Sequence, residues 1–175
     1  MQQPVRVSCQ QYMMLRIQMA KRVDGASVMR CTRPDASVTW QKIVNHGAHF
    51  ALHDLTHFAV ETTLGYRRGF YGLLAEGWDF DDIGGKGARG RLPAEAVEVE
   101  QIVGVFDSER ACGTLLTLDE FNQFAPRKLT ETEVLSVRKL RAELFTRWSA
   151  VPAGQNLDLE FQPASPQIPA AAKRS

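Results

Sequence analysis

The chain has 175 residues, of which 44% are hydrophobic and 23% charged, and its formal net charge is +1. These values are typical of a soluble globular protein that builds its core without disulfide or metal support. Basic residues are spread along the chain, and no apolar run approaches the ~20 residues that cross a bilayer. We therefore expect no nucleic-acid partner and no membrane span.

The start of the chain, MQQPVRVSCQQ, does not have the basic end and the apolar middle of a signal peptide. The cytoplasm is therefore the expected compartment. The three cysteines are odd in number and widely spaced, which predicts neither a disulfide framework nor a CxxC zinc site. We expect one domain over residues 1–162 and a disordered tail, rich in Pro and Ala, over residues 163–175.

Strands are predicted for the first third of the chain, where apolar and β-branched residues alternate with turn residues. The predicted strands cover residues 12–22, 26–32 and 37–43, and residues 5–9 are a candidate for a fourth strand. The turn at Pro34-Asp35-Ala36 has Pro in the position that a type I turn favours. This pattern predicts an antiparallel meander.

Helices are predicted for most of the remaining chain. The expected helices cover residues 47–64, 70–76, 93–110, 117–124 and 130–148, and a loop rich in Gly, Asp and basic residues covers 79–91. Gly65 is a natural stop for the first helix, and Thr130 with Glu133 forms a capping box for the last one. The expected fold is α+β, with a meander of three or four strands packed against four or five helices, one of them a zincin-like metal helix.

The helix over residues 130–148 has an apolar face that favours the core, although a dimer contact is also open. Its apolar positions are Val134, Val137, Leu140, Leu144 and Phe145, and its charged side is expected to face solvent with Arg138, Lys139, Arg141 and Glu143.

All four histidines of the chain lie within twelve positions, at His46, His49, His53 and His57. On a helix, His53 and His57 are one turn apart, so both imidazoles can reach one ion at about 2.0 to 2.1 Å. The opposite side of this helix is apolar, and apolar residues also flank the histidine stripe. We therefore expect the histidines to line a cleft. His53 and His57 are the expected metal ligands, His49 is an alternate ligand, and His46 is expected not to bind the ion.

A catalytic zinc site needs a third protein ligand, and two carboxylates are candidates. Glu61 lies one turn beyond His57, but side chains on three consecutive turns of a straight helix diverge. Glu76 can approach from a second helix and is the preferred candidate, with Glu61 and His49 as alternates.

The segment HDLTH at residues 53–57 is followed, after eighteen residues, by Glu76 in the stretch LLAEGW. This pattern resembles the gluzincin metallopeptidases, whose motif is HExxH followed by a Glu at that distance. The resemblance covers about 30 residues. It implies that His53, His57 and Glu76 bind zinc or another divalent transition metal, and that Asp54 takes the place of the general base.

An HDxxH segment with a downstream Glu also resembles the zinc motif of coenzyme Q biosynthesis proteins, which implies a role without hydrolysis. Three functional hypotheses follow. The first is a zinc-dependent hydrolase, in which metal-bound water, assisted by Asp54, attacks a carbonyl of an unidentified small molecule or peptide. The second is a metal-binding accessory or ligand-binding protein. In either case a zinc-bound histidine is expected to donate its second ring N–H to an acid, for which Asp54, Glu61 and Asp79 are the candidates, so Asp54 is open between general base and orienting acid. The third is a metal-free interaction domain whose histidines face a partner.

Overall fold

A meander of three strands opens the part of the chain that the structure, a computed structural model, describes; this part comprises residues 14–44 and 47–164. The strands are β1 (Leu15–Lys21), β2 (Ser27–Thr32) and β3 (Val38–Ile43), and each pairs antiparallel with the next. All three lie where the sequence predicts them.

Both turns of the meander end on a residue with positive φ. Gly25 has φ 80°, which glycine adopts without steric cost, whereas Ala36 has φ 65°. The amide of Ala36 donates to the carbonyl of Arg33 at 3.0 Å, and this bond closes the predicted turn around Pro34 and Asp35.

A fourth strand, β4 (Asn156–Phe161), comes from the C-terminal side of the chain and pairs antiparallel with β1. The sheet order is β3-β2-β1-β4. The sequence analysis did not predict β4, although its burial alternates strictly. The candidate strand over residues 5–9 lies outside the described residues.

Six helices complete the described part of the chain, so the α+β class is confirmed. They are α1 (Gly47–Leu64), α2 (Phe70–Ala75), α3 (Phe80–Ile83), α4 (Ala94–Cys112), α5 (Leu118–Phe124) and α6 (Glu131–Ala150). The predicted capping box of Thr130 and Glu133 is present at the start of α6. The short helix α3 lies in the segment that was expected to be a loop, and the side chains of Asp79 and Asp82 cap it.

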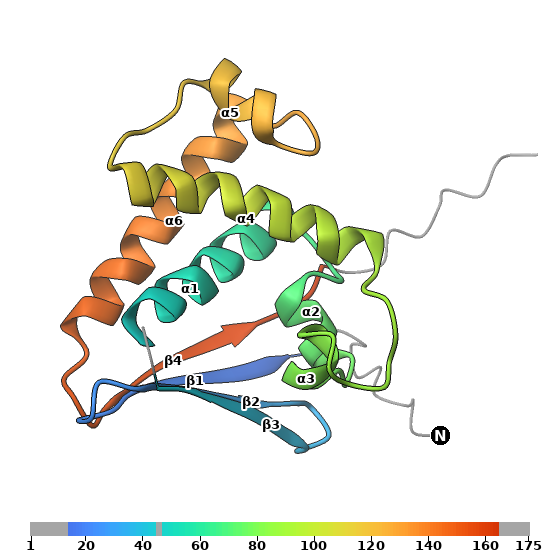
Figure 1. Ribbon diagram of the computed structural model, residues 1–175, viewed down its shortest axis with the longest axis vertical. Helices are drawn as coiled ribbons and strands as arrows, with labels where there is room; N and C mark the ends of the chain where they lie inside the picture. Colours follow the sequence, from blue (N-terminus) through green and yellow to red (C-terminus); the bar gives the residue numbers. More distant parts are fainter. Residues whose placement is uncertain (1–13, 45–46, 165–175) are drawn as a thin grey trace, which may run out of the picture.

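All six helices lie on one side of the sheet, and α5 is the farthest from it (Figure 1). Leu15, Ile17 and Met19 of β1 point to this side and are almost completely buried, whereas Arg16 and Gln18 point to the open face. This alternation is what a sheet covered on one face requires.

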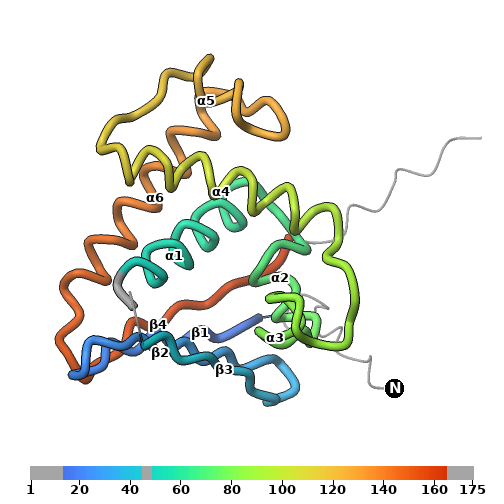
Figure 2. Tube along the Cα trace, viewed as in Figure 1, coloured from blue at the N-terminus to red at the C-terminus, as the bar shows by residue number. Residues whose placement is uncertain are grey.

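Helix α1 occupies the centre of the helical layer, and α4 and α6 pack against it (Figure 2). Its residues Ala51, Leu55 and Ala59 are buried, and so are His57 and Glu61 on the opposite side. Both sides of α1 are therefore covered at these positions.

Helix α6 uses its predicted apolar face in the core, where Val134, Val137 and Leu144 are buried. The expectation that Arg141 faces solvent is wrong, because this side chain is buried and donates to the Phe106 carbonyl and to Glu109. The buried Glu109 carboxylate compensates the charge of Arg141. No helix of the described residues is both long enough and apolar enough to cross a membrane.

Candidate metal centre between α1 and α4

The helical spacing of α1 places His53 and His57 side by side. Their ring centroids are 4.8 Å apart, and the rings meet edge to face at 79°. The His57 side chain is 4% exposed and the His53 side chain 27% exposed. The histidine pair therefore reaches from the interior to the surface of the protein.

Glu100 of α4 faces both histidines. Its Oε2 lies 3.0 Å from Nε2 of His57, and its Oε1 lies 3.8 Å from Nε2 of His53. One ligand atom from each of the three residues lies within 4.8 Å of the others, and this is the one such group among the described residues. We call His53, His57 and Glu100 the His/Glu cluster.

The second nitrogen of His53 is held by Asp107, which lies two turns beyond Glu100 on α4. Nδ1 of His53 donates to Oδ2 of Asp107 at 2.8 Å, because a carboxylate can only accept. Burial raises the pKa of Asp107, but hydrogen bonds from His53 and Arg110 outweigh this effect and lower the pKa to about 2. With its proton on Nδ1, a neutral His53 has the Nε2 lone pair free to bind an ion.

The second nitrogen of His57 faces Glu61, one turn further along α1. Nδ1 of His57 lies 3.6 Å from Oε1 of Glu61, slightly beyond hydrogen-bond length, and it is the one buried side-chain polar atom of the described residues without a hydrogen-bond partner. A small movement of the imidazole toward Glu61 completes this bond. Each histidine then has one ring nitrogen hydrogen-bonded to a carboxylate behind it, Asp107 or Glu61, and the other ring nitrogen facing Glu100.

Glu61 is held in place by the start of α2. Its carboxylate accepts from the amides of Tyr71 at 3.1 Å and Gly72 at 3.3 Å, and its side chain is buried. A Cβ atom added at Gly69 would lie 2.6 Å from Oε2 of Glu61, so only glycine fits there. The predicted second helix thus contributes to the site through its backbone.

The electrostatics of the cluster favour a cation at its centre. Burial lowers the pKa of His57, but the carboxylates of Glu100 and Glu61 more than offset this and raise the pKa to about 9. In turn, the contact with His57 lowers the pKa of Glu100. A proton on His57 therefore occupies, in the metal-free protein, the place that a divalent cation can take.

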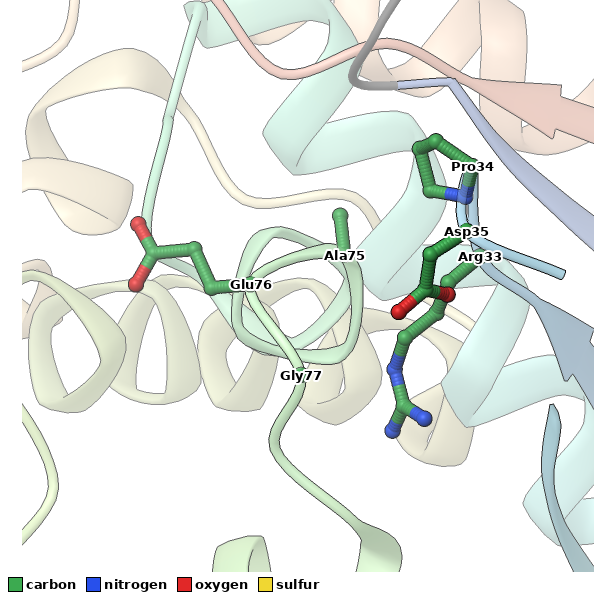
Figure 3. A pocket seen from close by; sticks show the side chains of 6 residues that line it. All are labelled: Arg33, Pro34, Asp35, Ala75, Glu76 and Gly77. Atoms are coloured by element: carbon green, nitrogen blue, oxygen red, sulfur yellow. The ribbon is translucent and has the colours of Figure 1, made fainter. Parts of the chain in front are cut away.

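Glu76, the preferred third ligand in the sequence analysis, does not join the histidines. Its two carboxylate oxygens accept from Nε of Arg68 at 3.1 and 3.0 Å. Glu76 also borders a cavity of about 180 Å³ beside Arg33, but its carboxylate points away from the other lining side chains (Figure 3). The start of α2 contacts Glu61 of α1, whereas Glu76 follows the other end of α2, where its carboxylate meets Arg68.

The other residues singled out by the sequence lie around the cluster or outside the described part. Glu61 backs His57, and His49 is exposed, with Nδ1 3.4 Å from the guanidinium of Arg110. His46 lies outside the described residues. Asp54 is buried, and the hydroxyl of Tyr71 donates to its backbone carbonyl at 3.1 Å.

The Asp54 carboxyl interacts electrostatically with Cys31 of β2 and Tyr71 of α2, and also with the two histidines of the cluster. Burial raises its pKa to about 7, and the charges of His57 and His53 partly oppose this rise. Asp54 therefore titrates near neutrality but makes no hydrogen bond to either histidine in the described structure.

Sequence reasoning missed Glu100 and Asp107, because it searched for a third ligand only in the segments next to the histidine helix. One signal was available. Glu100, Gly104 and Asp107 follow the i, i+4, i+7 spacing of one helix face, whereas Val99, Val103 and Phe106 form the buried face of α4. An acidic stripe beside an apolar face indicates a helix that packs at the edge of a polar site.

Comparisons with known protein families, with curated proteins and with solved structures find no match to this chain. The resemblance to the gluzincin motif stays a prediction from the sequence.

Proposed function

We propose that the chain binds one divalent transition-metal ion, zinc by preference, through Nε2 of His53, Nε2 of His57 and the carboxylate of Glu100. Tetrahedral ligands at about 2.1 Å from zinc are separated from one another by roughly 3.4 Å. Oε2 of Glu100 lies 3.0 Å from Nε2 of His57, and its other oxygen, Oε1, lies 3.8 Å from Nε2 of His53, so each histidine is near that separation from one oxygen of the carboxylate. This agreement is the observation that carries the proposal.

The carboxylates behind the histidines support a metal centre over a structural ion pair. Metal-binding histidines typically donate their other ring N–H to a carboxylate or carbonyl, which sets the tautomer and orients the ring. Asp107 does this for His53, and Glu61 lies in position to do it for His57. A separate carboxylate behind each imidazole is expected of a metal site and is not expected of a solvated polar helix face.

We further propose that the bound ion activates water for hydrolysis of a carbonyl compound. Three protein ligands leave a fourth position open, and zinc lowers the pKa of a water bound there to about 7. The Glu100 side chain is 62% exposed, so the outer side of the cluster faces solvent. This exposure favours hydrolysis over an accessory role, for which we would expect a closed apolar cavity beside the ion.

Asp54 remains a candidate for the proton acceptor because its pKa of about 7 suits that task. Its carboxyl makes no hydrogen bond to either histidine in the described structure, which supports an indirect contribution, in which its charge acts on His57 and His53.

Zinc titration of tag-free, chelator-treated protein tests the proposal, with affinity measured by calorimetry and metal content by elemental analysis. Glu100→Gln, His53→Ala and His57→Ala should each weaken zinc binding by about 100-fold or more. Glu76→Gln is the matched control, since Glu76 was the preferred acid by sequence and pairs with Arg68 in the structure.

The hydrolytic part is tested separately with 4-nitrophenyl acetate. Zinc-loaded protein should cleave this ester, and both Glu100→Gln and chelation should remove the activity.

Tight zinc binding by the Glu100→Gln protein, together with loss of binding in Glu76→Gln, would overturn the assignment of the third ligand.

A further inference from the structure

Arg110, near the C-terminal end of α4, presents a loosely engaged guanidinium beside the His/Glu cluster. Its Nε donates to Oδ1 of Asp107 at 3.3 Å, and Nη1 and Nη2 each lie 3.4 Å from Nδ1 of His49. These lengths are at the long end for hydrogen bonds, and hydrogen bonds from arginine to a carboxylate or phosphate are usually shorter, near 2.7 to 2.9 Å. The side chain is 20% exposed, so solvent reaches it.

The cluster and Arg110 lie along the same seam between two helices. His49, His53 and His57 follow one stripe of α1, and Arg110, Asp107 and Glu100 face them in the same order from α4. Four residues along a helix correspond to roughly 6 Å. The guanidinium is therefore about one to two helical turns from the cluster.

Gly104 leaves this seam uncovered on the α4 side. It lies between Glu100 and Asp107 on the same helix face, it is exposed, and a Cβ atom added there would meet nothing within 4 Å. A glycine inside a helix costs up to about 1 kcal/mol relative to alanine. Its presence leaves room at this point of the seam, between Glu100 of the cluster and Asp107, which contacts Arg110.

We propose that Arg110, assisted by His49, is an anion subsite that holds a carboxylate or phosphate group of the substrate while the reacting carbonyl lies at the metal. This inference rests on the proposed function and adds to it the class of substrate: a small molecule or chain end with an oxyanion a few bonds from the scissile group. The planar guanidinium offers two parallel donors to such a group. The incoming oxyanion replaces the long contacts between Arg110 and His49.

Calorimetric titration of protein loaded with stoichiometric zinc tests the subsite, with inorganic phosphate and acetate as separate probes. Arg110→Gln should weaken binding of the preferred probe by about tenfold or more, because a charge-assisted, two-donor contact is lost. Arg110→Lys should give an intermediate loss, and His49→Gln a smaller one. Arg91→Gln is the matched control, since Arg91 is an exposed arginine of the loop before α4.

Elemental analysis first confirms one zinc ion per chain in each variant, because Arg110 also contacts Asp107 and its loss can alter zinc affinity. Thermal melting checks that each variant is folded, and His49→Gln gives a second measure if Arg110→Gln does not fold. Dependence of either probe on Arg110 supports the proposal, and the stronger probe distinguishes carboxylate from phosphate. Equal binding of both probes by wild type and Arg110→Gln overturns it. Failure of the wild type to bind zinc instead rejects the proposed function.

Discussion

Asp107 of α4 accepts a 2.8 Å hydrogen bond from Nδ1 of His53 on α1, and this contact links the two helices that form the cluster. The bond fixes which nitrogen of His53 carries the proton, and it turns Nε2 toward Glu100. The other carboxylate oxygen of Asp107 accepts from Nε of Arg110 on its own helix at 3.3 Å, so contacts from both helices hold Asp107 in place. The cluster is therefore preorganised by residues that do not themselves bind the ion.

Replacement of Asp107 by Asn should weaken zinc binding by about 10- to 100-fold while the fold is retained, since loss of a carboxylate behind a metal-binding histidine usually has an effect of this size. The measurement is zinc affinity by competition with a chelating dye. Asp119→Asn on the acidic first turn of α5 is the control, because that residue lies outside the cluster. Unchanged affinity in Asp107→Asn would show that His53 does not need its backing acid.

Zinc binding near neutral pH should release about one proton from His57, because its pKa of about 9 keeps it protonated in the metal-free protein and the metal requires the neutral ring. Calorimetry in buffers of different ionisation enthalpy measures this number. His53→Ala is not informative here, because it removes a ligand. The control is the same titration at pH 6, where a metal-bound water with a pKa of about 7 stays largely protonated and the release should still be at least about one proton. A proton count of zero at neutral pH would contradict the predicted protonation of His57.

Stability of the metal-free protein should fall as the pH rises from about 4 to about 9. The folded pKa of Asp54, about 7, is above its ordinary value of 3.8, and that of His57, about 9, is above 6.5. In both cases the folded state holds its proton more tightly than the unfolded state, so stability is lost as the pH rises through each interval. Urea unfolding in the presence of a chelator, repeated across this range, measures the effect.

Asp54→Asn should flatten the lower part of this pH dependence, because the amide has no proton to lose. Relative to wild type it should be more stable above pH 7, by up to about 4 kcal/mol if the whole shift of Asp54 is expressed. Zinc affinity should change little, and loss of esterase activity would identify Asp54 as the proton acceptor. Full turnover by Asp54→Asn would leave it with a purely structural role.

Gly69 and Gly104 provide a matched pair of glycine-to-alanine substitutions. Gly69→Ala should destabilise the protein by about 1 to 3 kcal/mol, because the new methyl group overlaps the buried Glu61 carboxylate. Gly104→Ala should stabilise it by up to about 1 kcal/mol, because the position is helical and open. Equal melting temperatures for the two variants would show that Glu61 is free to move.

Local patterns in the sequence were sufficient for most elements. The alternation in β1 to β3, the turn residues between them, and the capping box at Thr130 act over a few residues, so the chain pattern alone predicts them. Strand β4 was missed because it obtains its stability from pairing with β1, a partner about 140 residues away. The short helix α3 was missed although its capping residues, Asp79 and Asp82, are local, because its four residues precede a run of glycines that is typical of a loop. Burial of Arg141 was missed for a similar reason, because its partner Glu109 belongs to another helix.

The candidate site likewise has a part that the local sequence predicts and a part that depends on tertiary contacts. The sequence by itself determined that His53 and His57 are neighbours, because four residues make one turn of any α-helix and the ring positions follow from that period. Only the tertiary structure decided which acid meets them: the antiparallel approach of α4 brings Glu100 and Asp107 to the rings, whereas the chain between α1 and α2 turns Glu76 toward Arg68. The packing of the whole apolar core decides which helices contact each other and at which residues. The spacing of a sequence motif does not encode these contacts.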